Sequence, residues 1–180
     1  HIAHSIVAES VRVQLILDKI IFIPSGNPPM KESIPAEDRL AMAYLAFGDD
    51  INFEISDIEV RDLTEKSYTV NTLKKLKLKY EGERIKLFLI IGVDNLLDLP
   101  RWKDPEQLFG LADVVVINRP GFDPNDSKPE FYEKVKFISV PFLEISSTMI
   151  REYVKIGRPV KYLVTKEVEE YIEANNLYIK

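Results

Sequence analysis

The sequence contains no cysteine, and this absence excludes disulfides, thiolate metal sites and a cysteine nucleophile. A chain without cysteine suits a reducing compartment, so we expect it to be cytoplasmic. No apolar run approaches the roughly 18 residues of a membrane span, and no stretch has the pattern of a signal peptide. The net charge of -5 argues against general nucleic-acid binding, which usually needs a basic excess.

Two nucleotide-binding motifs are also missing. The chain has no Gly-x-x-x-x-Gly-Lys-Ser/Thr loop, which argues against a P-loop kinase or ATPase, and no Gly-x-Gly-x-x-Gly, which argues against a dehydrogenase. What is present is a globular composition, with 46% hydrophobic and 29% charged residues in a chain of 180. This length suits one domain with a sizeable core.

Apolar segments rich in β-branched residues alternate with helical patterns along the chain. Near-continuous apolar runs predict buried parallel strands, and they lie at 20–23, 87–91, 114–117 and 135–140, with an alternating edge strand at 51–55. Apolar residues at helical spacing predict helices, and they lie around 7–15, 40–47, 73–80, 150–154 and 165–174. This alternation predicts a doubly wound α/β fold with a mainly parallel sheet.

In such folds, ligands bind outside the carboxyl ends of the strands. The predicted strands are followed by loops of unusual composition, at 24–31, 92–94, 118–121 and 145–148. We therefore expect the functional residues to gather at one edge of the sheet.

The only two histidines, His1 and His4, begin a helical pattern. Residues three apart share a helix face, and a helix start offers free N–H groups and partial positive charge. Two imidazoles there could donate hydrogen bonds to phosphate oxygens during transfer. A tag remnant and a metal-binding pair are the alternatives, but a metal site needs further ligands that no cysteine or third histidine supplies.

Ser146, Ser147 and Thr148 precede a predicted helix that carries Arg151 in its first turn. Hydroxyl and N–H groups at a helix start form an anion site, and arginine adds a planar fork for phosphate oxygens. The alternative is simple N-capping. A cation in the first turn opposes the helix dipole, and a bound anion would explain its position.

Five further residues lie in or near the predicted strand-end loops. Lys31 and Arg119 are basic loop residues, for which a solvated surface charge is the alternative. Gly92 allows close backbone approach, and Asp94 suits a ribose hydroxyl or a helix cap. Trp102, the single tryptophan, is either a packing residue or a stacking platform for an aromatic ligand.

Together these segments resemble the nicotinate mononucleotide adenylyltransferase family. His1-Ile2-Ala3-His4 resembles the family's His-x-Gly-His motif, and residues 145–151 resemble its second signature, both shared by the wider nucleotidyltransferase superfamily. The family's order is kept by further segments at 28–31, 67–73, 90–94, 102 and 163–178. Tyr68, Thr69 and Trp102 are the residues that narrow the resemblance to a pyridine mononucleotide.

The resemblance implies a Rossmann-like nucleotidyltransferase fold with a small C-terminal helical extension. It also implies that nicotinate mononucleotide attacks the α-phosphorus of ATP, with Mg²⁺ bound to the nucleotide, releasing pyrophosphate and forming deamido-NAD. The implied catalytic residues are His1, His4 and Arg151. The implied ATP-binding residues are Gly92, Asp94, Arg119, Ser146, Ser147 and Thr148. The implied residues for nicotinate mononucleotide are Lys31, Tyr68, Thr69 and Trp102.

Two features depart from the family. Ala3 stands where glycine is usual, and the family usually carries a strand and a phosphate loop before the first histidine. We therefore expect residues 1–180 to be a single domain preceded by a segment of about a dozen residues or slightly more. Nicotinamide mononucleotide, another phosphate acceptor and a catalytically silent nucleotide-binding homologue remain open alternatives. The sequence leaves the oligomeric state open, and a homo-oligomer is compatible with it.

Overall fold

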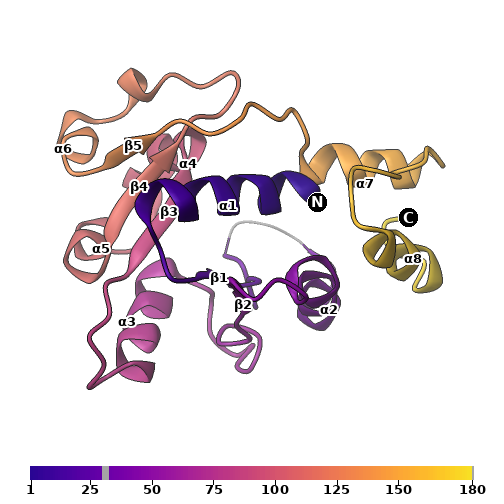
Figure 1. The fold of residues 1–180 in the computed structure, drawn as a ribbon, viewed down its shortest axis with the longest axis horizontal. Coiled ribbons are helices and arrows are strands. Elements are labelled where there is room, and N and C mark those ends of the chain that lie inside the picture. The colour runs from indigo at the N-terminus through magenta and orange to yellow at the C-terminus, as the bar shows by residue number, and fades with distance from the viewer. Residues whose placement is uncertain (30–32, 180) are drawn as a thin grey trace. The chain divides into compact units, whose positions relative to one another are not determined.

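The computed structural model describes residues 1–29 and 33–179. The chain divides into two compact units. The terminal unit consists of His1–Glu65 and Leu143–Lys180, and the central unit of Lys66–Phe142. Each unit contains a parallel sheet and several helices, which Figure 1 labels.

The terminal unit is built on two short parallel strands, β1 (Ile20–Phe22) and β2 (Phe53–Ile55), with Ile20 opposite Phe53. Its helices are α1 (Ile2–Leu15), α2 (Ala36–Phe47), α7 (Ser147–Lys155) and α8 (Lys166–Ala174). Aromatic rings join the elements, because Phe22 stacks on Phe47 with ring centroids 4.0 Å apart and meets Phe53 edge-on at 5.2 Å.

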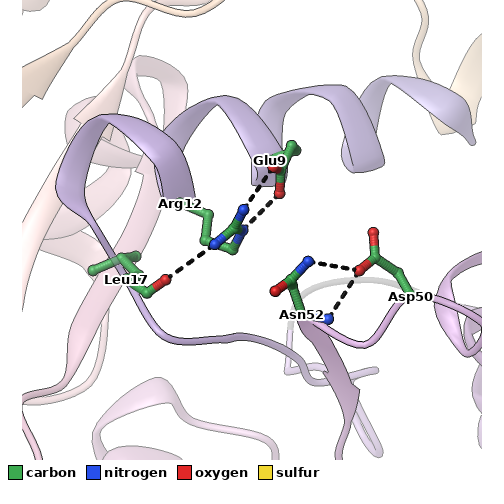
Figure 2. A network of polar contacts seen from close by, with 5 residues as sticks. All are labelled: Glu9, Arg12, Leu17, Asp50 and Asn52. Atoms are coloured by element: carbon green, nitrogen blue, oxygen red, sulfur yellow. Dashed lines mark hydrogen bonds and ion pairs between the residues drawn. The ribbon is translucent and has the colours of Figure 1, made fainter.

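The end of α1 is held by a polar network (Figure 2). The Arg12 guanidinium donates to both carboxylate oxygens of Glu9, at 2.7 and 2.8 Å, and to the carbonyl of Leu17 at 3.4 Å. In the turn before β2, the Asp50 carboxylate accepts hydrogen bonds from the backbone and side chain of Asn52. These contacts fix the chain on the side where β1 begins.

A separate apolar cluster joins α7, α8 and the segment between them. Its buried members are Ile150, Val160, Val164, Val168, Ile172 and Leu177. The Thr165 hydroxyl caps α8 by accepting a hydrogen bond from the Val168 N–H, and the helix lies within the predicted range of 165–174. The Tyr171 hydroxyl of α8 donates to Asp38 of α2 at 2.9 Å. The C-terminal helices are therefore packed onto the rest of the terminal unit.

The central unit contains a three-stranded parallel sheet in the order β3 (Phe88–Gly92), β4 (Asp113–Ile117) and β5 (Lys136–Ile138). Residues 114–116 of the middle strand are fully buried, as expected for a parallel strand covered on both faces. The remaining elements are α3 (Thr69–Lys79), α4 (Val93–Asp98), η1 (Leu99–Arg101), α5 (Pro105–Leu111), η2 (Pro124–Asp126) and α6 (Pro129–Tyr132).

The structure confirms an α/β fold with parallel strands. Every predicted strand is present, although β2 begins at Phe53 and β5 covers only Lys136–Ile138. The strands of the described residues lie in two sheets, one in each unit. The description of residues 1–180 as one domain stays a prediction. Within the described part of the chain, no helix is both long and apolar enough to cross a membrane.

Candidate active site

The two histidines lie together at the start of α1. His1 is the N-cap residue and His4 lies in the first turn. Their rings are stacked with centroids 3.8 Å apart and an interplanar angle of 20°. Two protonated imidazoles this close would repel each other, and an anion bound against both rings would offset that repulsion.

Neighbouring residues hold this pair in place, and one ring nitrogen of His1 has no hydrogen-bond partner among the described residues. The His4 ring meets Phe47 edge-on at 6.4 Å, and the Ile2 N–H donates to the carbonyl of Leu163 at 3.0 Å. The Nδ1 atom of His1 is buried and has no hydrogen-bond partner among the described residues. Because buried polar atoms are normally paired, this nitrogen points to a ligand.

The second predicted phosphate segment forms the start of α7. The Ser146 hydroxyl accepts a hydrogen bond from the Met149 N–H at 3.1 Å and is the N-cap. The capping alternative is therefore what the structure shows for Ser146, whose oxygen is already engaged. Its role in ATP binding stays a prediction.

Ser147 and Thr148 differ from Ser146 because both are exposed in the first turn of α7. The N–H groups of a first turn have no intrahelical partner, so both residues offer a backbone donor and a hydroxyl. The exposed Arg151 side chain folds back over this turn, with Nη2 donating to Oγ1 of Thr148 at 3.0 Å. The three side chains form one cluster of donors suited to an anion.

In the central unit, Gly92, Asp94 and Arg119 come together at the carboxyl ends of β3 and β4. Gly92 is opposite Ile117 in the sheet, which brings the loops after the two strands side by side. Arg119 Nη1 lies 2.6 Å from Oδ2 of Asp94. The other carboxylate oxygen, Oδ1, is buried without a hydrogen-bond partner among the described residues.

Gly92 leaves room for the carboxylate of Asp94. A Cβ at this position would lie 2.4 Å from Asp94 Oδ1, closer than side-chain atoms approach one another. The backbone of Gly92 is the N-cap of α4 in an ordinary extended conformation, so the constraint is steric. Asp94 is not the cap of α4, because the cap position is Gly92 and carries no side-chain bond.

The predicted pyridine-binding residues also lie in the central unit. Tyr68 is the N-cap of α3, Thr69 is its first residue, and Trp102 follows η1 with its side chain partly buried. Lys103, next to Trp102, places its ammonium 4.7 Å from the centre of the Tyr68 ring. The segments that carry Tyr68 and Trp102 are therefore neighbours.

Three contributing residues were missed by sequence reasoning. Lys103 follows Trp102 in the sequence, but its contact with the Tyr68 ring depends on the fold. The Asn118 amide donates to the carbonyl of Val140 and accepts from its N–H, at 3.0 and 2.6 Å, which ties the end of β4 to the chain after β5. Arg39 of α2 bonds the loop after β1. The predicted residue Lys31 lies outside the described residues.

The comparisons with known proteins identify the family of the chain. Residues 1–153 match the cytidylyltransferase-like family, so the chain is a member of this class of nucleotidyltransferases. A relative from Thermoanaerobacter sp. (strain X514) is 40% identical over 190 residues, covering 100% of this chain and 89% of the relative. Another from Roseiflexus sp. (strain RS-1) is 41% identical over 186 residues, covering 99% and 92%.

Both relatives carry the name "probable nicotinate-nucleotide adenylyltransferase". At this identity over essentially the whole chain, the protein belongs to the nicotinate-nucleotide adenylyltransferase family. The resemblance found in the sequence is thus confirmed.

A solved structure supports the fold. The nicotinic acid mononucleotide adenylyltransferase of Plasmodium falciparum, complexed with NaAD, superposes with a TM-score of 0.80 at 19% identity, covering 99% of this chain and 91% of the other. The same enzyme complexed with APC gives a TM-score of 0.77. The Rossmann-like nucleotidyltransferase fold expected from the sequence is therefore confirmed.

Proposed function

We propose that this chain transfers the adenylyl group of ATP to nicotinate mononucleotide, giving deamido-NAD and pyrophosphate in NAD biosynthesis. The observation that carries the proposal is the stacked pair of His1 and His4 at the start of α1, in a chain that belongs to this family. The proposed substrates are two small nucleotides, without a nucleic-acid or membrane partner. The cytoplasmic location and any homo-oligomer stay predictions.

The reaction needs charge stabilisation and positioning. A phosphate oxygen of nicotinate mononucleotide forms a bond to the α-phosphorus of ATP, and the bond from that phosphorus to the oxygen of the β-phosphate breaks. The electron pair leaves with pyrophosphate. His1 and His4 donate hydrogen bonds to phosphate oxygens where charge develops, and the partial positive charge of the α1 start adds to them.

The start of α7 supplies the remaining donors for the triphosphate. Ser147 and Thr148 offer backbone N–H and hydroxyl groups, and Arg151 offers a guanidinium held over the same turn. These groups bind the β- and γ-phosphates and so favour departure of pyrophosphate. Ser146 contributes by fixing the geometry of the turn as its cap.

In the proposal, the central unit recognises the nucleosides. The Oδ1 atom of Asp94 accepts a hydrogen bond from a ribose hydroxyl of ATP, and Arg119 holds the other oxygen of that carboxylate. Gly92 lets the adenosine approach the backbone. Trp102 stacks on the nicotinate ring. The substituents of that ring are received around Tyr68 and Thr69, and Lys31 is assigned to the phosphates.

Mg²⁺ enters the proposal with ATP. Among the described residues, no group of three or more histidine, aspartate or glutamate side chains forms a metal cage. Mg²⁺ prefers water and substrate phosphates to an all-protein site, so the triphosphate fits as the main source of ligands. When bound, the ion neutralises phosphate charge.

The deciding experiment compares two acceptors with the purified protein. Pyrophosphate release and dinucleotide formation are measured with ATP and either nicotinate or nicotinamide mononucleotide. The proposal expects deamido-NAD to form with the higher kcat/KM. A preference for nicotinamide mononucleotide supports the sibling activity instead, and ATP binding without turnover on either acceptor supports a silent homologue.

A further inference from the structure

The connection between β1 and α2 is joined at its two ends by one side chain, that of Arg39. Nε donates to the carbonyl of Ser25 at 3.1 Å, and Nη2 donates to the carbonyls of Ser25 and Gly26, the latter at 2.8 Å. Nη1 donates to the Ser33 hydroxyl at 2.7 Å and to the carbonyl of Ile34. A guanidinium has five N–H donors, and loop acceptors account for all of them.

The location of Arg39 is unfavourable for a cation on its own. It lies in the first turn of α2, where the helix dipole disfavours positive charge. Burial lowers the pKa of Arg39, while Tyr178, Glu37 and Glu59 oppose that shift. The helix therefore does not explain the residue, whereas the loop carbonyls do, since charge-assisted hydrogen bonds are stronger than neutral ones.

The same loop is fixed at a second place. A Cβ on Gly26 would lie 1.8 Å from the carbonyl oxygen of Glu59, so the loop backbone lies directly against the segment after β2. Nδ2 of Asn27 donates to the carbonyl of Leu63 at 3.1 Å. With one side of the loop held by this contact, Arg39 determines where its two ends lie relative to α2.

This loop follows the carboxyl end of β1, where parallel α/β folds bind ligands. We propose that Arg39 is a positioning residue for adenylyl transfer: it holds residues 25–26 and 33–34 together and so places residues 25–27, at the carboxyl end of β1, for phosphate-bearing substrates. This inference rests on the proposed function. Lysine cannot replace arginine here, because the three N–H donors of an ammonium all radiate from one nitrogen and do not span both ends of the loop as the planar guanidinium does.

The test uses Arg39→Lys and Arg39→Met, with Arg12→Lys as the matched control. Arg12 is also a helix arginine that bonds a loop carbonyl, that of Leu17, but in the loop that enters β1. KM and kcat for both substrates are measured with the melting temperature and the hydrogen exchange of amides around Ser25–Asn27.

We expect Arg39→Lys to raise the KM of at least one substrate about tenfold, which corresponds to ~1.4 kcal/mol, and to change kcat less than about threefold. Hydrogen exchange of the amides around Ser25–Asn27 should accelerate. Arg12→Lys should leave the KM values and these exchange rates within about twofold of those of the unsubstituted protein. Unchanged KM values in a folded Arg39→Lys protein overturn the inference, even if its melting temperature falls.

Should the unsubstituted protein make no deamido-NAD, the proposed function fails, and that failure is separate from the role of Arg39. ATP affinity measured by calorimetry then takes the place of KM. A loss of ATP affinity together with faster loop exchange in Arg39→Lys supports the positioning role, and unchanged affinity overturns it.

Discussion

Among the described residues, each unit contains one buried side-chain nitrogen or oxygen without a hydrogen-bond partner, and the two atoms differ in chemistry. In the terminal unit the atom is Nδ1 of His1, and in the central unit it is Oδ1 of Asp94. The first belongs to a ring stacked on a second imidazole at a helix start. The second belongs to a carboxylate whose other oxygen is paired with Arg119.

In the proposed function, this difference corresponds to two tasks, the binding of phosphate charge and the recognition of nucleosides. The terminal unit presents mainly donors, which phosphates require, whereas the central unit presents an acceptor and aromatic rings, which sugars and bases require. We therefore expect loss of a phosphate-facing donor such as His4 to act mainly on kcat, and substitutions around Asp94 and Trp102 in the central unit to act mainly on KM. The following experiments test that division.

The largest effect is expected for His4→Ala. Removing one donor to a developing oxyanion typically costs about 10²–10³ in kcat, and the exposed His4 side chain should add little to stability. Steady-state kinetics and thermal unfolding measure the two effects. Gln14→Ala, on the other end of α1 and bonded to Ser10, is the control. A loss of less than about tenfold would mean that His4 only packs against Phe47.

A smaller effect is expected for Gly92→Ala in the central unit. The new methyl would lie 2.4 Å from Asp94 Oδ1, so the carboxylate must move and its pairing with Arg119 must change. We expect the KM for ATP to rise about tenfold with a lower melting temperature, because such overpacking costs about 1–3 kcal/mol.

Gly110→Ala is the matched control for this variant. Apart from its chain neighbours and its own helix backbone, no atom of the described residues lies within 4 Å of a Cβ built on Gly110 in α5, and alanine favours a helix over glycine. Its melting temperature should stay level or rise. If Gly92→Ala lowers kcat and leaves the KM for ATP unchanged, the division between the two units is wrong.

The sequence was sufficient for those features that depend on local pattern. Continuous β-branched runs identified β4, since a strand buried on both faces needs apolar residues at every position. The capping residue Thr165 was recognisable because a hydroxyl before an apolar-periodic segment has a specific local use. The pair of His1 and His4 was recognisable because spacing of three fixes a shared helix face.

Long-range contacts could not be predicted in this way. The ion pair of Asp94 and Arg119 depends on the register that places Gly92 beside Ile117. The role of Arg39 has no local sequence signal, because most of its acceptors are backbone carbonyls that any residue could supply. The capping role of Ser146 likewise depends on the position of the Met149 N–H, and its role in ATP binding stays a prediction.

The smallest effect is expected for Lys103→Met, which removes the ammonium 4.7 Å from the Tyr68 ring. An exposed cation–π contact is worth about 0.5–1 kcal/mol, so the KM for nicotinate mononucleotide should rise about two- to fivefold. The KM for nicotinamide mononucleotide should rise less, because that ring lacks the carboxylate that a nearby cation attracts. Lys103→Arg should leave the KM for nicotinate mononucleotide close to that of the unsubstituted protein.

Lys79→Met is the control for this last variant, because Lys79 lies 4.9 Å from the Tyr80 ring in a contact of the same kind at the end of α3. It should change neither KM. Equal changes for the two mononucleotides in Lys103→Met would show that the contact only orients Tyr68. A larger rise in the KM for nicotinate mononucleotide would show that Lys103 helps to distinguish the two acceptors. The central unit would then recognise the charge of the pyridine ring's substituent as well as the shape of the ring.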